Sequence, residues 1–193
     1  MQEYYKLQTC SRQKTLGMPV LSINNGQLLG RIKQVLLDGK TYRVIGFVTE
    51  KRMGNISEER ILPLHQVNSF GRDSITVSDV SVLERKGHTP QYIPSIRRPL
   101  TVIGSRVFTV GGNIVGKTED FLFEISDGSL AYLQISLKDE SGCILAPGRR
   151  IIAIAPQTII MKDQALEESI IPDVFTQERI NDTSADICIT EGR

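Results

Sequence analysis

The chain has 193 residues, of which 40% are hydrophobic and 23% charged, and its formal net charge is +1. These values are typical of globular proteins and exclude a chain too polar to bury a core. The longest wholly apolar run, residues 151–155, is far shorter than the roughly 20 residues of a membrane-crossing helix, and the N-terminus lacks the apolar core of a secretory signal. We therefore expect a cytoplasmic protein without a membrane span.

After an N-terminal lead, residues 1–15, the pattern predicts a first all-β unit over residues 16–86. The dipeptides Asn25-Gly26 and Asp38-Gly39 accept the positive φ of tight hairpin turns. They separate apolar runs that we interpret as strands, at residues 20–23, 27–38, 42–48, 60–67 and 75–79.

A proline-rich linker, residues 87–99, follows the first unit. It contains Pro90, Pro94 and Pro99. Because proline lacks a backbone N–H and disrupts a helix interior, we expect an extended, semi-rigid connector here.

Residues 100–163 repeat the order of strands and turns of the first unit. In residues 131–137 every second side chain is apolar, which is typical of a half-buried strand. Equivalent positions are 84 to 89 residues apart, and the offset changes only at turns: Val20 and Val107, Gly30 and Gly116, Tyr42 and Ala131, Ile75 and Ile159. The sequence therefore predicts an all-β protein of two tandem small β-barrels, each folding around its own aliphatic interior and helped by mutual packing.

The C-terminal segment, residues 164–193, contains seven acidic and two basic residues. Its net charge of −5 leaves +6 for the rest of the chain. Residues 164–171 could form a short helix that ends before Pro172, and the polar, acidic composition beyond that point predicts disorder.

Four stretches of the first unit resemble the PRC-barrel family, which is named for the H subunit of photosynthetic reaction centres. They comprise a glycine turn, a strand that ends in an acidic residue, a hydrophobic strand and a closing hydrophobic-Pro-hydrophobic strand, at residues 16–20, 25–38, 44–48 and 60–67. The second copy departs from this pattern, because Pro156 is displaced from the place of the closing proline. The resemblance implies a fold and no particular chemistry.

Family members include bacterial and archaeal proteins of unassigned role, the reaction-centre subunit and the C-terminal domain of a ribosome maturation factor that binds a small-subunit protein. The reaction-centre subunit carries a membrane helix, which this chain lacks, and the maturation factor has a different N-terminal barrel. Neither role therefore transfers directly to this chain.

The residue types that carry out catalysis are sparse, and we predict no catalytic residue, cofactor or metal site. Cys10, Cys143 and Cys188 lie far apart, so we expect Cys143 to be a small buried residue and the other two to be flanking thiols. His65 could carry a proton or serve as a ligand, but no second His, Cys or acidic residue lies at ligand spacing, so we expect a structural role for it. His88 is expected to be an exposed linker residue. The sequence leaves open whether Cys143 or His65 has a role beyond packing.

Acidic and arginine residues give two further candidates. Asp38 and Glu124 occupy equivalent places in the repeat and could form a proton site, although turn preference or solvation accounts for them too. The most concentrated basic pairs could bind phosphate or an acidic partner surface, or simply add solubility or contact the acidic tail: Arg97, Arg98, Arg149 and Arg150.

The sequence thus favours a non-enzymatic adaptor or scaffold that binds an unknown protein partner. A homo-oligomer, in which the chain binds further copies of itself, is possible as well. Assistance in ribosome maturation or RNA processing is an alternative, and a redox or electron-transfer accessory role through Cys10, Cys143 or His65 is another. Few aromatic residues lie among basic ones, so we expect no nucleic-acid binding outside ribosomal assembly.

Overall fold

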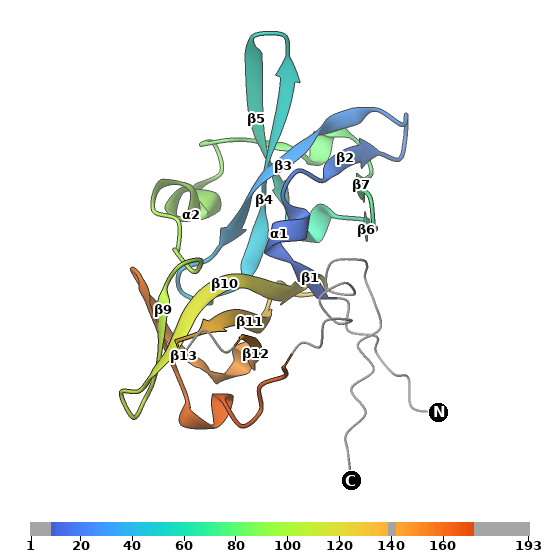
Figure 1. The fold of residues 1–193 in the computed structure, drawn as a ribbon. Coiled ribbons are helices and arrows are strands. Elements are labelled where there is room, and N and C mark those ends of the chain that lie inside the picture. Colours follow the sequence, from blue (N-terminus) through green and yellow to red (C-terminus); the bar gives the residue numbers. More distant parts are fainter. Residues whose placement is uncertain (1–8, 139–141, 172–193) are drawn as a thin grey trace.

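The computed structural model describes residues 9–138 and 142–171, which form two seven-stranded sheets joined by short helices (Figure 1). The first sheet has the order β6-β7-β2-β3-β4-β5-β8, with bounds β2 Pro19–Ser22, β3 Leu28–Leu37, β4 Val44–Met53, β5 Ile56–Pro63, β6 Ser69–Phe70, β7 Ile75–Val77 and β8 Glu84–Arg85. The second has the order β12-β11-β10-β9-β14-β13 with β1 paired to β10, and its bounds are β1 Thr9–Ser11, β9 Arg106–Thr109, β10 Ile114–Glu124, β11 Leu130–Leu137, β12 Cys143–Pro147, β13 Ile151–Ala155 and β14 Thr158–Met161. The helices are α1 Arg12–Thr15 and α2 Ile93–Arg97, and the 3-10 turns are η1 Leu64–Gln66, η2 Val80–Val82, η3 Pro90–Tyr92, η4 Gly148–Arg150 and η5 Asp163–Ala165.

The two sheets share one topology, which confirms the predicted tandem repeat. In each sheet a late strand returns to pair in parallel with the first strand of its unit. Val20 of β2 lies opposite Ile75 of β7, and Val107 of β9 lies opposite Ile159 of β14. These are the residues that the sequence places at equivalent positions, so the repeat extends to contacts between distant parts of the chain.

Strands dominate both units, and the predicted all-β class is confirmed. The sequence also predicted that each sheet curls into a barrel, which would remove exposed strand edges. Among the described residues the strand pairings of each sheet form an open path, from β6 to β8 in one and from β12 to β13 in the other, and do not close into a ring.

The N-terminal lead contributes a strand to the second unit. Cys10 of β1 lies opposite Phe123 of β10, and α1 then carries the chain from the second sheet to the first. Ser11 is buried, and its hydroxyl donates a 2.5 Å hydrogen bond to Oδ2 of the buried Asp120. The lead therefore links the two units at one edge of the second sheet.

The linker differs from its predicted extended form, because it contains η3 and α2. Pro90 and Pro94 lie in the first turns of these helices, where a backbone N–H would have no partner inside the helix. Tyr92, which is 2% exposed, and Ile96 pack against the first sheet. The prediction of an extended connector was wrong because it considered the number of prolines and not their position in a helical turn.

One continuous hydrophobic core spans both units, so the prediction of two separate interiors was also wrong. Phe47 and Phe70 of the first sheet lie 6.2 and 6.3 Å, between ring centroids, from Phe123 of the second. The Val44 amide of the first unit also donates a 2.7 Å hydrogen bond to the Gly128 carbonyl of the second. The predicted mutual packing is confirmed, because buried residues of both units belong to one cluster, and small units bury too little surface alone.

Residues 164–171 form no α-helix. The η5 turn is followed by turns and by a bridge in which Ile170 pairs with Leu145 of β12. The predicted disorder beyond Pro172 and Cys188 both lie outside the described residues. None of the described helices has the length and apolar character needed to cross a membrane.

Candidate functional site

A two-stranded arm extends from the first sheet. It is built from β4 and β5, which have ten and eight residues and pair without interruption from Gly46–Pro63 to Met53–Ile56 (Figure 1, top). The equivalent strands β11 and β12 have eight and five residues. The long arm is therefore a feature of the first copy.

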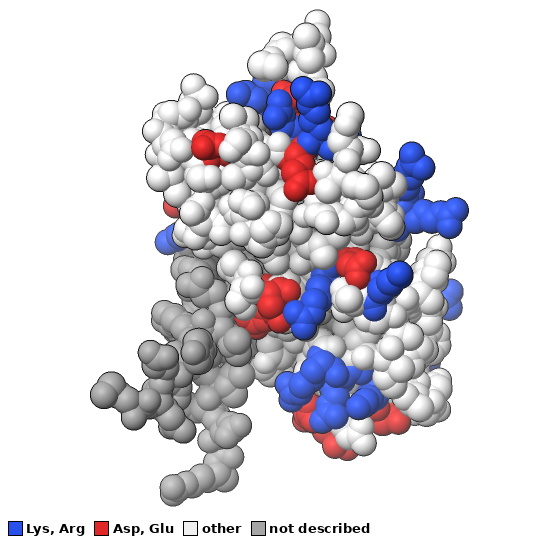
Figure 2. Space-filling model, turned by 180° about the vertical axis from the view of Figure 1, so that it is seen from behind, with Lys and Arg blue, Asp and Glu red and all other residues white. Residues whose placement is uncertain are grey.

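The tip of the arm is apolar and exposed. Met53 and Ile56 lie opposite each other, with 53% and 68% of their surfaces exposed, and Gly54 between them adopts a φ of 60°. Figure 2 shows this uncharged tip above a belt of basic and acidic side chains. Two adjacent apolar side chains on a projecting turn form a contact point that the fold itself leaves uncovered.

Ion pairs brace the stem of the arm. Lys33 of β3 binds Glu50 of β4 at 2.8 Å and Glu59 of β5 at 2.5 Å, and Glu59 also pairs with Lys86. Arg52 approaches Glu50 at 2.7 Å. Hydrogen bonds from Lys33, Arg52 and Ser57 lower the pKa of Glu50 to about 2. One surface pair contributes little, but these pairs form a connected network that joins β3, β4 and β5 at the stem of the arm.

The predicted arginine pairs lie on different units. Arg149 and Arg150 flank Glu168, which accepts from Arg149 Nη2 at 2.8 Å and from Arg150 Nε at 3.0 Å. This is the contact with the acidic segment that the sequence analysis held as an alternative. Arg97 and Arg98 are exposed at the end of α2, and within the described residues no ion pair engages them.

Asp38 and Glu124 end equivalent strands but have different environments. Asp38 accepts hydrogen bonds from the amide and hydroxyl of Thr41, which lower its pKa. Burial raises the pKa of Glu124, with a smaller effect from Asp127, and its Oε2 has no partner among the described residues. Asp38 therefore stabilises its turn, and no hydrogen bond joins the two carboxylates in the described structure.

The cysteines and histidines also lie apart. Cys10 is half-buried in β1, 3.4 Å from the Thr15 hydroxyl, and burial raises the pKa of its thiol. Cys143 is only half-buried in β12, so it is not the fully buried residue that we predicted. His88 is exposed, as expected of a linker residue, and His65 is exposed too, so the expectation that packing explains His65 was wrong. Residues 9–138 and 142–171 contain no group of three or more His, Cys, Asp or Glu side chains that could hold a metal ion.

Sequence reasoning missed both the arm and the buried Asp120. The pair Gly54-Asn55, flanked by Met53 and Ile56 inside a charged stretch, was an available signal for an exposed hairpin tip. Asp120 offered no signal, because its partners come from the lead, more than 100 residues away.

The family model of the PRC-barrel domain matches residues 12–83 and 101–176. The chain belongs to the PRC-barrel family. The two matched segments agree with the two sheets, so the resemblance seen in the sequence and its tandem arrangement are confirmed. No curated protein matches the PRC-barrel chain closely enough to add a more specific relative.

Proposed function

We propose that this tandem PRC-barrel protein is a non-enzymatic adaptor that binds another protein through the tip of the β4–β5 arm. The PRC-barrel domain is a small module that is typically non-catalytic and often takes part in protein interactions. The observation that carries the proposal is the braced arm with Met53 and Ile56 exposed at its end. A stiff element loses little conformational entropy on binding, which favours recognition by a preformed surface.

The partner surface that fits this tip is an apolar pocket bordered by charged groups. Met53 and Ile56 would enter the pocket, while the belt of basic and acidic side chains below them would meet its rim. Arg97 and Arg98 remain a proposed second contact for acidic groups of the partner, because they are exposed and carry no ion pair within the described residues.

The alternatives drawn from the sequence stay predictions. No described group of residues favours ribosome maturation or RNA processing. A redox role through Cys10 is less favoured, because a raised thiol pKa reduces the thiolate fraction.

The test begins with affinity capture by the full chain from its native cell and ends with purified components. A captured protein is identified by mass spectrometry, purified and titrated against the chain by calorimetry. Because each tip side chain can contribute about 1.5 kcal/mol when it is buried, the double variant Met53→Ser, Ile56→Ser should weaken binding by at least tenfold.

The matched controls are Ile23→Ser and Val110→Ser, which remove apolar side chains that are 58% and 61% exposed near other hairpin turns. They should leave the dissociation constant unchanged within about twofold. Equal affinity of the double variant and the wild type would refute a role for the arm. Equal weakening by the controls would show general stickiness in place of a specific site.

A further inference from the structure

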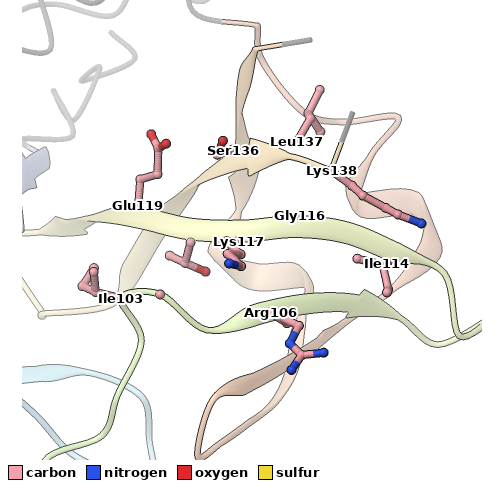
Figure 3. A pocket seen from close by; sticks show the side chains of 11 residues that line it. Ile103, Arg106, Ile114, Gly116, Lys117, Glu119, Ser136, Leu137 and Lys138 are labelled. Atoms are coloured by element: carbon pink, nitrogen blue, oxygen red, sulfur yellow. The ribbon is translucent and has the colours of Figure 1, made fainter. Parts of the chain in front are cut away.

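The outer face of the second unit is hollowed where β9, β10 and β11 lie side by side (Figure 3). The hollow has a volume of about 570 Å³, which is within the range of small-molecule sites. It lies on a different unit from the β4–β5 arm.

Three cationic side chains line this hollow. Arg106 of β9 and Lys117 of β10 lie directly opposite each other, and Lys138 follows the end of β11. Figure 3 shows the three side chains on neighbouring segments of the sheet. All three are exposed, and no ion pair engages them within the described residues. Like charges directly opposite on neighbouring strands are unfavourable, so the fold does not explain the Arg106–Lys117 pair.

The first copy shows what the fold accepts at the same place. Its cross-strand row is Pro19–Arg31–Glu50, whereas the row in the second copy is Arg106–Lys117–Ser136. Compared with the first copy, the second copy has the cation Arg106 in place of Pro19 and the uncharged Ser136 in place of Glu50. Glu119 also lines the hollow, at the end opposite Lys138. Its carboxylate accepts a 3.3 Å hydrogen bond from the side-chain amide of Gln134.

Aliphatic side chains also line the hollow. Ile103, Ile114 and Leu137 surround the cations, and Ile114 is 40% exposed. Apolar walls with a few convergent charges are typical of sites for ligands that have an apolar body and a charged group. We propose that this hollow binds a small organic anion, such as a carboxylic acid with an aliphatic or aromatic body, with Arg106, Lys117 and Lys138 neutralising its charge.

The fluorescent anion anilinonaphthalene sulfonate is a suitable probe, and the uncharged N-phenylnaphthylamine is its matched control. The full chain should bind the sulfonate at one saturable site, bind the uncharged dye at least threefold more weakly, and release the sulfonate as salt is added. Octanoate should displace the probe, and octanol at the same concentration should not.

Variants locate the site. Lys117→Met and Arg106→Met keep an apolar stem and should each weaken binding of the sulfonate about three- to tenfold. Arg31→Met, at the equivalent strand position of the first copy, should change it less than twofold. Because both pocket variants relieve a like-charge pair, their urea midpoints should equal or exceed that of the wild type, which verifies folding. Equal binding of the two dyes, or equal weakening by Arg31→Met and Lys117→Met, would overturn the proposal.

Discussion

Replacing Thr118 with valine should stabilise the protein. Thr118 is 2% exposed, and its hydroxyl has no hydrogen-bond partner among the described residues. Its equivalent in the first copy is Ile32, so an apolar side chain fits this place in the sheet. A buried hydroxyl without a partner costs about 1–3 kcal/mol, and valine replaces it with a methyl group of similar volume.

The first copy provides a control with the opposite sign. Thr49 is also 2% exposed, but its hydroxyl donates a 3.2 Å hydrogen bond to the Arg60 carbonyl. Thr49→Val removes this bond and should destabilise the protein by about 1 kcal/mol. Thr118→Val should instead gain about 1 kcal/mol, which corresponds to about 2–4 °C in melting temperature for a chain of this length.

Urea unfolding followed by circular dichroism measures both effects, since the chain contains no tryptophan. The two midpoints should move in opposite directions with unchanged slopes, because neither variant alters the surface exposed on unfolding. Equal losses of stability in Thr118→Val and Thr49→Val would show that the Thr118 hydroxyl is hydrogen bonded in solution, and would refute the reasoning.

Three further changes test the link between the units. Ser11→Ala removes both the donor to buried Asp120 and the acceptor that caps α1 at the Lys14 amide, and should cost about 2 kcal/mol in urea unfolding. Ser22→Ala loses one hydrogen bond and should cost about 1 kcal/mol, and equal losses in the two variants would contradict the double role of Ser11. Phe123→Leu should lower the free energy of unfolding by about 1–2 kcal/mol and accelerate the hydrogen exchange of backbone amides in β4 and β11 by the same factor. Acceleration in β11 alone would indicate that the two units have separate cores. Burial raises the folded-state pKa of Glu124 above its ordinary 4.5, so the free energy of unfolding should fall as pH rises from 4.5 through that raised pKa. The urea midpoint of Glu124→Gln, measured against pH, should lack this fall. A profile equal to that of the wild type would contradict the role of Glu124.

Local chemistry made the repeat predictable. Turn dipeptides such as Asn25-Gly26 identify hairpins because only a few residues accept a positive φ, and Gly26 has a φ of 69°. Gly116, the third residue of β10, is a glycine for a different reason. A side chain at Gly116 would overlap the Ser136 carbonyl, so this position is small because a neighbouring strand passes close to it. The repeat of glycines was therefore identified correctly from the sequence, although the glycine at position 116 is required by packing and not by a turn.

Contacts between distant segments were not predictable from one sequence. The strand β1 has only three residues, and its partner β10 begins more than 100 residues later, so no local periodicity reveals the pairing. The shared core has the same origin, since Phe47 and Phe123 each carry only the pattern of their own strand. The arginine pairs illustrate the limit for surfaces, because only the fold shows that Glu168 engages Arg149 and Arg150 while Arg97 and Arg98 stay exposed.

The two copies act as controls for each other when function is sought. Positions that the fold requires are filled alike, as in the parallel pairs Val20–Ile75 and Val107–Ile159. An exposed feature found in one copy and absent from the other is therefore not needed for folding. The apolar tip of the first copy and the Arg106–Lys117 row of the second both meet this condition, and each has a cost that folding alone leaves unexplained. Because one hydrophobic core joins the copies, a partner on the arm and an anion in the hollow would be bound by units that share buried residues.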